Sequence, residues 1–287
     1  MTQLVTVLAG DGVGPEVTRA AVMVCRAALP AGAVEWSEAS FGAAACHQHG
    51  DPFPEATRQS CVESAAVLLG AVGGDGPLPE GTRRPEAGLL DLRRELGTFA
   101  NLRPVRPHPA LLGASPLRAE VLAGVDLLFV RELTGGIYFG AKERTEDSAT
   151  DVCTYTVTEV ERIVRKAAEL ASSRGNRITS VDKANVLETS RLWREVTERV
   201  LDQEFPDISY EHALVDSMAM HLLSRPSKFD VIVTENMFGD ILTDEASVLA
   251  GSMGMLPSAS LGEDGGGIFE PIHGSAPDIA GRGIANP

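Results

Sequence analysis

The stretch "VLAGDGVGPEVTRA" at residues 7–20 joins a short apolar run to the start of a helix through three glycines. The apolar run is typical of a buried strand, and Pro15 favours the first turn of a helix, where its missing N–H is not needed. The dinucleotide-binding fingerprint spaces its glycines as G-x-G-x-x-G. Here the third glycine, Gly14, comes one residue early, and Glu16 would repel a pyrophosphate. The stretch therefore predicts a strand, a tight turn and a helix, but no dinucleotide site at this position.

Short apolar runs alternate with longer amphipathic segments along the rest of the chain. The runs that predict strands are residues 4–9, 67–72, 126–130, 177–181 and 230–234. The segments that predict helices are residues 16–29, 156–173, 189–204 and 239–251. This alternation is typical of α/β proteins, whose strands are buried on both faces. Two glycine-rich passages, 73–88 and 260–287, are expected to be functional loops.

Composition and charge narrow the class of protein. The chain has 287 residues, of which 44% are hydrophobic, and a formal net charge of −15. This charge disfavours nucleic acid or an anionic membrane as a partner. The N-terminus lacks the features of a signal peptide, and no apolar run approaches the roughly 20 residues that span a bilayer. Four scattered cysteines without a C-x-x-C pair indicate neither zinc nor disulfides, so a reduced, cytoplasmic protein is expected.

Two carboxylates follow the last predicted strand, in "VTENMFGDILTDEASVLAG" at 233–251. Asp240 and Asp244 are four residues apart, so on a helix both project from one face. Such a pair is often only a solvated acidic face. It also provides the oxygen ligands that Mg²⁺ or Mn²⁺ prefers, and it lies where open α/β sheets place their sites, at the carboxyl end of a strand. Both interpretations stay open on this pattern alone.

Other side chains suit the recognition and proton chemistry of a small carboxylic acid. Arg93, Arg103 and Arg131 lie beside apolar residues, and arginine is the usual bidentate partner of a carboxylate. Tyr138 and Lys183 are of the right type to donate or accept a proton. Taken singly, the pattern favours a surface or structural ion pair for each arginine, half-buried packing for the tyrosine and a surface charge for the lysine.

Several long blocks carry a resemblance to a known family. They are "GDGVGPEV", "FANLRPVR", "RELTGGIYFG", "DKANVLETSRLWREV", "TENMFGDILTDEASVLAGSMGMLPSASLG" and "FEPIHGSAPDIAGRGIANP". With them the chain resembles, over essentially its whole length, the metal-dependent β-decarboxylating dehydrogenases that include isopropylmalate and isocitrate dehydrogenases. The resemblance implies an α/β fold of two domains with a nucleotide site outside any Rossmann fold. The first, nucleotide-binding domain would be 1–98 plus 251–287, and 99–250 would provide dimerisation, metal and substrate binding.

The same resemblance assigns roles to the candidate residues. Lys183 would take the proton of the substrate's 2-hydroxyl, and Tyr138 would return a proton to the carbon that loses CO₂. The residues implied in substrate binding are Leu89, Arg93, Arg103, Arg131 and Asp216. The implied metal ligands for Mg²⁺ or Mn²⁺ are Asp216, Asp240 and Asp244. Asp216 and Lys183 are expected to act across the interface of a homodimer.

The implied cofactor is NAD. The residues that the resemblance assigns to it are Gly73, Glu86, His273, Gly274, Ser275, Ala276, Pro277, Asp278, Ile279, Ala285 and Asn286. Asp278 would accept hydrogen bonds from the adenosine ribose, and its charge would repel the 2′-phosphate of NADP. After Gly73 the family usually continues with proline, lysine, tryptophan and aspartate, whereas this chain has "GDGPLPEGTRR".

The implied activity is NAD-dependent oxidative decarboxylation of 3-isopropylmalate to 4-methyl-2-oxopentanoate in leucine biosynthesis. Leu89 favours this substrate because an apolar side chain suits an isopropyl group and leaves a third carboxylate unpaired. The alternatives are the same chemistry on another 2-hydroxy diacid, such as a 3-alkylmalate, tartrate or homoisocitrate, and a truncated, non-catalytic interaction subunit. Relatives continue with further helices after the position of Asn286, so the chain is expected to lack the C-terminal end of the family.

Overall fold

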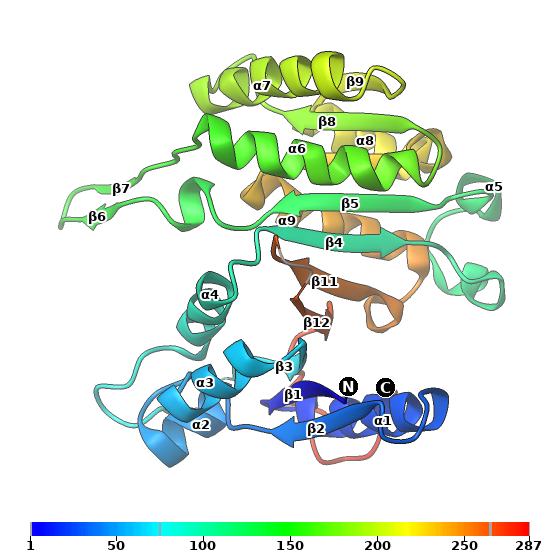
Figure 1. The fold of residues 1–287 in the computed structure, drawn as a ribbon. Helices are drawn as coiled ribbons and strands as arrows, with labels where there is room; N and C mark the ends of the chain where they lie inside the picture. Colours follow the sequence, from blue (N-terminus) through cyan, green and yellow to red (C-terminus); the bar gives the residue numbers. More distant parts are fainter. Residues whose placement is uncertain (1, 75, 264–265, 287) are drawn as a thin grey trace. The chain divides into compact units, whose positions relative to one another are not determined.

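The structure is a computed structural model that describes residues 2–74, 76–263 and 266–286 (Figure 1). The chain divides into two compact units, residues 1–98 with 257–287 and residues 99–256. The first and last residues of the expected first domain, 1 and 287, lie outside the described residues. Residue 75, in the expected loop 73–88, also lies outside them. The chain returns to the first unit at Pro257 and not at 251. The reason is that residues 248–251 pack within the second unit, where Ser115 Oγ donates to the Val248 carbonyl.

The described residues of the first unit contain five strands in the order β2-β1-β3-β12-β11. The strands are β1 (Gln3–Gly10), β2 (Val34–Glu38), β3 (Ala66–Ala71), β11 (Pro257–Leu261) and β12 (Gly267–Pro271). β1 is parallel to β2 and β3, β3 is parallel to β12, and β11 and β12 form an antiparallel pair. The passage 260–287 is therefore only partly a loop, because its beginning lies in a hairpin. Its glycines hid the short strand "GIFEP" from sequence reasoning.

Helices cover the strands of the first unit. They are α1 (Gly14–Ala28), α2 (Gly42–His49), α3 (Glu55–Glu63) and α4 (Pro85–Glu95). Val7 and Leu8 point to opposite faces of β1, so the sheet is buried on both sides. α1 lies behind the strands in Figure 1, and α2 and α3 lie in front of them. Beneath the front helices the core contains Phe41, Phe53 and Leu92.

The second unit has five strands in the order β4-β5-β10-β8-β9. They are β4 (Ala100–Val105), β5 (Leu127–Glu132), β8 (Arg177–Asp182), β9 (Ser209–Leu214) and β10 (Val231–Thr234). β5, β10, β8 and β9 are mutually parallel, and β4 is antiparallel to β5. The carboxyl ends of β5, β8 and β10 therefore meet at one edge of this sheet. Arg131, Lys183 and the first residue of the helix after β10, Asn236, lie at this edge.

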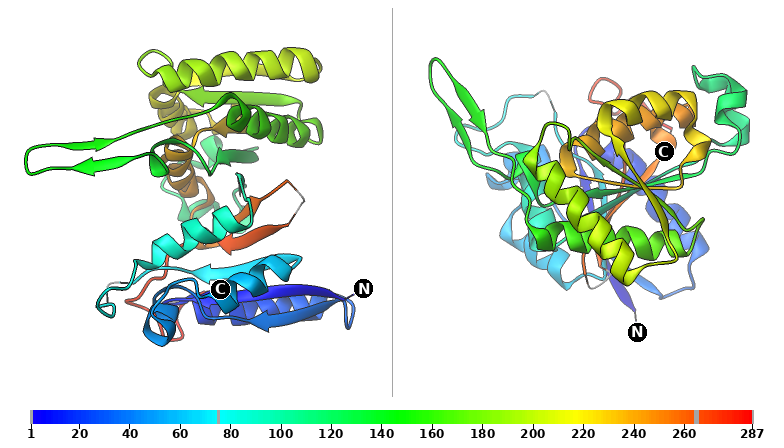
Figure 2. Two further views of the ribbon diagram at one scale, coloured as in Figure 1. Left: turned by 60° about the vertical axis from the view of Figure 1, so that its left-hand side comes forward. Right: turned by 90° about the horizontal axis from the view of Figure 1, so that it is seen from above.

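Helices cover both faces of these strands. They are α5 (Ala119–Leu122), α6 (Val157–Ser172), α7 (Glu188–Glu204), α8 (Val215–Ser224) and α9 (Asn236–Ser247). α6 and α7 lie on one face, and α8 and α9 on the other (Figures 1 and 2). The core between α6, α7 and the sheet contains Ile163, Trp193 and Val231. Short 3-10 turns complete the unit at Pro109–Ala114, Gly136–Tyr138, Pro226–Lys228, Val248–Ala250 and Met253–Met255.

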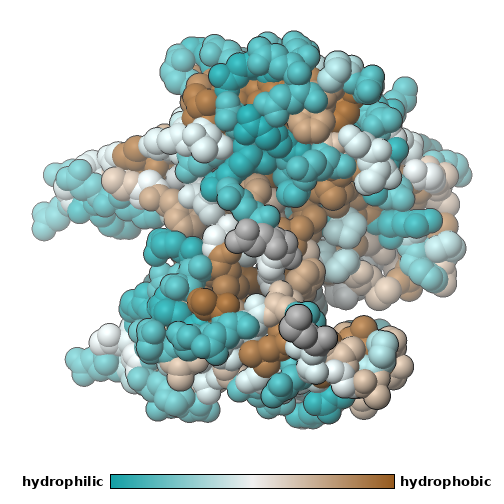
Figure 3. Space-filling model, viewed as in Figure 1, coloured by the Kyte–Doolittle hydropathy of each residue, from teal (hydrophilic) through white to brown (hydrophobic). Residues whose placement is uncertain are grey.

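A two-stranded hairpin projects from the second unit (Figures 1 and 2). It consists of β6 (Lys142–Arg144) and β7 (Ala149–Asp151), whose residues are all exposed. Its outer end is hydrophilic in Figure 3, as is most of the surface over α6 and α7. In the part of the chain that the structure describes, no helix has the length and apolar character needed to cross a membrane.

The predicted strands and helices all exist, with shifted ends. The largest shift of a starting residue is at α9, which begins at Asn236 where the sequence predicted 239. The side chain of Glu235 accepts a hydrogen bond from the backbone N–H of Phe238, and this cap starts the helix before Gly239. The expected α/β fold class is confirmed by this alternation of strands and helices.

The glycine turn after β1 is held by an unusually close backbone contact. Gly12 has φ +57, and a Cβ there would lie 1.9 Å from the carbonyl oxygen of Ser275. The neighbouring N–H of Val13 donates to that same oxygen at 2.8 Å. The turn therefore packs directly on the segment after β12, at a distance that only glycine allows.

Substituting Gly12 with alanine should reveal how tightly this contact is built. Gly12→Ala adds overpacking to left-handed strain and should lower the free energy of unfolding by about 2–4 kcal/mol. Gly32→Ala is the matched control, because Gly32 also has positive φ (+77) but no atom within 4 Å of the place where a Cβ would lie; it should cost about 1 kcal/mol. Urea unfolding of both variants measures the difference, and equal losses would contradict the contact.

Candidate active site

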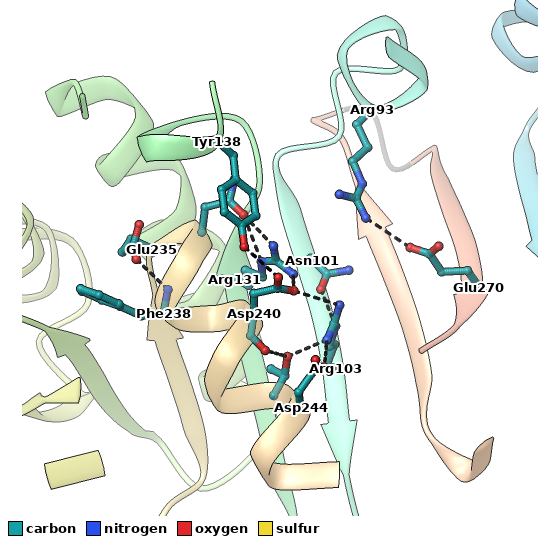
Figure 4. Close-up of polar contacts among 12 residues, drawn as sticks. Arg93, Asn101, Arg103, Arg131, Tyr138, Glu235, Phe238, Asp240, Asp244 and Glu270 are labelled. Atoms are coloured by element: carbon teal, nitrogen blue, oxygen red, sulfur yellow. Dashed lines mark hydrogen bonds and ion pairs between the residues drawn. The ribbon is translucent and has the colours of Figure 1, made fainter. Parts of the chain in front are cut away.

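A buried arginine lies at the carboxyl end of β5. Arg131 is 2% exposed, and its Nη1 donates to Asp240 Oδ1 at 2.5 Å (Figure 4). Its Nη2 and Nε donate to the side-chain oxygen of Asn236 at 2.7 and 3.2 Å. A Cβ on Gly239 would lie 2.6 Å from Arg131 Cγ, so α9 must have glycine at the point where the arginine passes. The guanidinium is thus locked between β5 and α9.

A second arginine lies beside it on β4. The register of the antiparallel pair sets Asn101 opposite Arg131, and Arg103 follows on the same face of the strand. Arg103 Nε donates to Asn101 Oδ1 at 3.0 Å, and Nη1 donates to Thr243 Oγ1 at 2.6 Å. Nη1 also lies 3.4 Å from Asp244 Oδ1. The structure therefore brings two arginines together with the two predicted carboxylates of α9.

Tyr138 completes this cluster. Its hydroxyl donates to Asp240 Oδ2 at 2.8 Å, and its ring lies near the guanidinium of Arg131. Burial, followed by the hydrogen bond to Asp240 and the charge of that carboxylate, raises the pKa of Tyr138 to about 12. The phenol consequently keeps its proton at neutral pH and is available as a proton donor.

A buried carboxylate shapes the turn that carries Tyr138. Glu132 is fully buried and accepts hydrogen bonds from the N–H and hydroxyl of Thr134 and from the N–H of Gly135. Arg162 on α6 donates to the same carboxylate at 3.3 Å. This network fixes the chain between β5 and the short turn at Gly136–Tyr138. The backbone that carries the phenol of Tyr138 is therefore held in a defined position.

Lys183 lies at the end of β8 and contacts Asp216 in the first turn of α8. The ammonium group of Lys183 is the main reason why the pKa of Asp216 is lowered. The backbone N–H of Lys183 donates to Ser190 Oγ at 3.0 Å. The preceding Asp182 is buried and accepts two hydrogen bonds from Arg194 and one from the N–H of Ala184. The lysine is therefore attached to a firmly held segment.

The three predicted metal ligands do not gather in one chain. Within residues 2–74, 76–263 and 266–286, no three acidic, histidine or cysteine side chains lie close enough together to hold a metal ion. Asp240 and Asp244 share one face of α9, while Asp216 is paired with Lys183. Asp244 is largely exposed, with 61% of its side chain open to solvent. The carboxylate oxygens of Asp240 and Asp244 fit a hard divalent cation, but they provide only part of its ligands.

The first unit holds the other predicted substrate residues on α4. Arg93 lies 3.6 Å from Glu270 on β12, and both side chains are mostly buried (Figure 4). Leu89 packs partly against the core of this unit. Glu86 is exposed in the first turn of α4, and a Cβ on Gly73 would lie 2.9 Å from its Oε1. Gly73 has φ +101, and this left-handed backbone conformation favours glycine at the position.

The predicted cofactor segment after β12 has an exposed outer side. Asp278 and Asn286 are exposed, whereas Ser275 is buried against the glycine turn of residues 10–14. Ala276 has φ +39, a conformation that costs energy for a non-glycine residue and often marks a functional segment. The remaining predicted residues of this segment, all at least partly accessible, are His273, Gly274, Pro277, Ile279 and Ala285. The accessible carboxylate of Asp278 can accept hydrogen bonds from the hydroxyls of a ribose.

Sequence reasoning missed several polar residues of the arginine cluster. Asn101, Asn236 and Thr243 each accept a hydrogen bond from Arg103 or Arg131. Asn236 had a usable signal, because it directly follows a buried strand at its carboxyl end. Asn101 had none, because its place opposite Arg131 depends on the register of two strands.

The comparisons with known proteins agree with this geometry. The profile described as "Isocitrate/isopropylmalate dehydrogenase" matches residues 4–287. The chain belongs to this dehydrogenase family. A curated 3-isopropylmalate dehydrogenase of Rhodopirellula baltica is 56% identical, and one of Bacillus subtilis is 51% identical. Both alignments cover 100% of this chain, which spans 82% and 81% of the two relatives.

Solved structures of the family have the same fold. The isocitrate dehydrogenase of Methylococcus capsulatus is 35% identical with a TM-score of 0.86, and the match covers 99% of this chain and 81% of that one. A β-decarboxylating dehydrogenase of Thermococcus kodakarensis is 40% identical with a TM-score of 0.81, over 100% of this chain and 79% of that one. The expected two-domain fold of this dehydrogenase family is therefore confirmed.

The network around Glu132 predicts a large loss of stability on neutralising this carboxylate. Glu132→Gln keeps the shape but replaces one acceptor oxygen with a donor facing N–H groups, and should cost about 2–4 kcal/mol of unfolding free energy. Glu159→Gln is the control, because Glu159 caps α6 at the surface by accepting from Thr156 N–H, and it should cost less than about 1 kcal/mol. Denaturant titrations give both values; a Glu132→Gln protein as stable as the control would contradict the proposed turn network.

Proposed function

We propose that the protein catalyses the metal- and NAD-dependent oxidative decarboxylation of (2R,3S)-3-isopropylmalate to 4-methyl-2-oxopentanoate, a reaction of leucine biosynthesis. The observation that carries the proposal is identity of 51–56% over the whole chain to curated 3-isopropylmalate dehydrogenases. The cluster of Arg103, Arg131, Tyr138 and Asp240 supports it with groups that suit a small dicarboxylate.

The arginines are proposed to bind the two carboxylates of malate. Arg103 and Arg131 already hold their guanidinium groups in fixed directions through Asn101 and Asn236, so little side-chain entropy is lost when a carboxylate binds. Arg93 is proposed as the third cationic contact, and Leu89 as the apolar contact of the isopropyl group. A matched methyl contact of this kind is worth about 1–3 kcal/mol of discrimination between substrates.

Proton transfers are assigned to two residues. Lys183, after giving up a proton, accepts the proton of the 2-hydroxyl, while the hydride on the same carbon leaves the substrate. NAD, when bound, supplies the acceptor for that hydride, and the divalent metal polarises the substrate oxygen. Loss of CO₂ from the carboxylate on the adjacent carbon leaves that carbon in need of a proton, which the phenol of Tyr138 donates. The geometry supports this role, because the Tyr138 hydroxyl lies beside Arg131 and is held by its hydrogen bond to Asp240.

The cofactor residues proposed for NAD lie in the first unit. They are Gly73, Glu86 and the segment from His273 to Ile279 with Ala285 and Asn286. The exposed carboxylate of Asp278 favours NAD over NADP, because it accepts from ribose hydroxyls and repels a 2′-phosphate.

A homodimer with shared sites is proposed for the cytoplasmic protein. The hairpin of β6 and β7 has open edges, and exposed edges readily pair with another chain. Met220, Leu223 and Ile241 leave apolar surface exposed on α8 and α9, two helices that pack against each other. A second copy placed there would let the partner's Asp216 join Asp240 and Asp244 at the metal, which a single chain does not achieve.

The proposal is tested by following NADH formation with isopropylmalate, isocitrate, homoisocitrate and tartrate. Isopropylmalate should be the best substrate by kcat/KM, and chelation of divalent metal with EDTA should abolish turnover until Mg²⁺ or Mn²⁺ is restored. If the enzyme prefers another diacid, the proposed substrate is wrong but the proposed reaction type stands. Absence of turnover on all four acids would overturn the proposed function and favour the non-catalytic alternative. Turnover that survives chelation would overturn the metal-dependent mechanism.

Two lysine variants test whether Lys183 is the base, with Lys166 as the control position. Lys183→Ala should lower kcat by at least about a hundredfold, because general-base catalysis contributes on that order. Lys166→Ala should retain wild-type turnover, because Lys166 only pairs with Glu169 on the surface of α6. Thermal unfolding of both variants checks that the loss is not a loss of fold.

A further inference from the structure

A buried carboxylate in the glycine turn joins three backbone segments of the first unit. Asp11 Oδ2 accepts from the N–H of Gly73 at 2.9 Å and from the N–H of Ala43 at 2.9 Å. Its Oδ1 accepts from the N–H of Ala44 at 3.0 Å. The N–H of Asp11 itself donates to the Ala71 carbonyl at 2.8 Å. One side chain therefore fixes the end of β3 and the start of α2 relative to the end of β1.

The charge of Asp11 is balanced by backbone groups. Within the described part of the chain, no basic side chain forms an ion pair with Asp11, and its partners are N–H groups at the N-terminus of α2 and in the segment after β3. A helix N-terminus stabilises a carboxylate in this position. Gly42 has φ +74, and a Cβ there would lie 2.4 Å from Asp11 Oδ2, so the helix approaches as closely as backbone permits.

The same turn holds the segment after β12. Gly12 and Val13 contact the carbonyl of Ser275, as described above. One helical turn further on, Glu16 Oε1 accepts from the N–H of Gly281 at 2.6 Å. Residues 11–16 are thus bonded on one side to Gly73 and on the other to residues 275–281.

Both segments are the ones proposed to bind NAD. Gly73 lies against Glu86, and residues 275–281 include Asp278. Their separation is fixed through Asp11 in the glycine turn and Glu16 in the first turn of α1. A misplacement of even 1 Å at a binding group is costly.

We propose that Asp11 and Glu16 are positioning residues of the cofactor site: they hold the Gly73 and Ser275–Gly281 backbones at the spacing that NAD requires. This inference rests on the proposed function. Neither residue needs to touch the cofactor, so their effect should appear in its affinity and not in the proton transfers at Lys183 and Tyr138.

The test is Asp11→Asn, because an amide nitrogen in place of Oδ2 or Oδ1 cannot accept from an N–H. The KM for NAD and the dissociation constant of NADH, measured by fluorescence, should rise about tenfold, while kcat and the KM for isopropylmalate change less than about twofold. Amide hydrogen exchange should show loss of protection at Gly73. Glu16→Ala removes the bond to Gly281 and should weaken NADH binding severalfold. This variant tests the proposal if Asp11→Asn does not fold.

Thr6→Val is the matched control. Thr6 is buried in β1, the strand before the glycine turn. Its hydroxyl bonds to Ser60 and Ser64 at the C-terminal end of α3 and to neither of the two segments. This variant should lose stability yet bind NADH like the wild type, which separates positioning from a general loss of stability.

The outcomes distinguish the two proposals. A wild-type protein that binds no NADH would overturn the proposed function, and the positioning role with it. If the wild type binds NADH and Asp11→Asn and Glu16→Ala bind it equally well, only the positioning role falls. Equal weakening by Thr6→Val would also overturn it, because the effect would then follow stability and not the spacing of the two segments.

Discussion

Because the guanidinium of Arg131 is buried, each of its N–H groups needs a hydrogen-bond acceptor from the protein. This requirement organises the second unit. Its partners Asn236 and Asp240 must come from α9, and Gly239 must leave room for the side chain. The cost of an unpaired buried charge is several kcal/mol, so α9 can start in only one place relative to β5. That placement also brings Asp240 to Tyr138, which couples the helix of the proposed metal ligands to the proposed proton donor. Asp11 is the corresponding buried charge of the first unit.

Sequence reasoning reached the fold because the signals of the fold are local. Apolar runs and amphipathic segments are read within a few residues, and they located β1, β8 and α6 closely. It failed where a signal was weak or depended on distant residues. The predicted start of α9 at 239 was late because the cap by Glu235 was not recognised, and the glycines around β12 concealed a strand. Residues with characteristic chemistry, such as Lys183 and Asp240, were found, whereas Asn101 acquires its role only through the β4–β5 register.

The glycine turn after β1 shows how a failed motif can still be informative. Its spacing excludes the phosphate-binding turn of a Rossmann fold, and the structure gives the spacing another use. Gly12 allows backbone contact with Ser275, and Asp11 and Glu16 bond to the segments on either side. The turn thus joins the two segments that are proposed to bind the dinucleotide. The glycines are needed for packing, and the acidic residues for spacing.

The central claim is that this chain removes a hydride and CO₂ from the same 2-hydroxy diacid. It is tested most directly with isopropylmalate that carries deuterium on C2, by measuring the label in the reduced cofactor and the amount of CO₂ released. The account predicts that the deuterium appears in the reduced nicotinamide and that one CO₂ is released for each NADH formed. Label retained in the organic product, or NADH formed without CO₂, would contradict it.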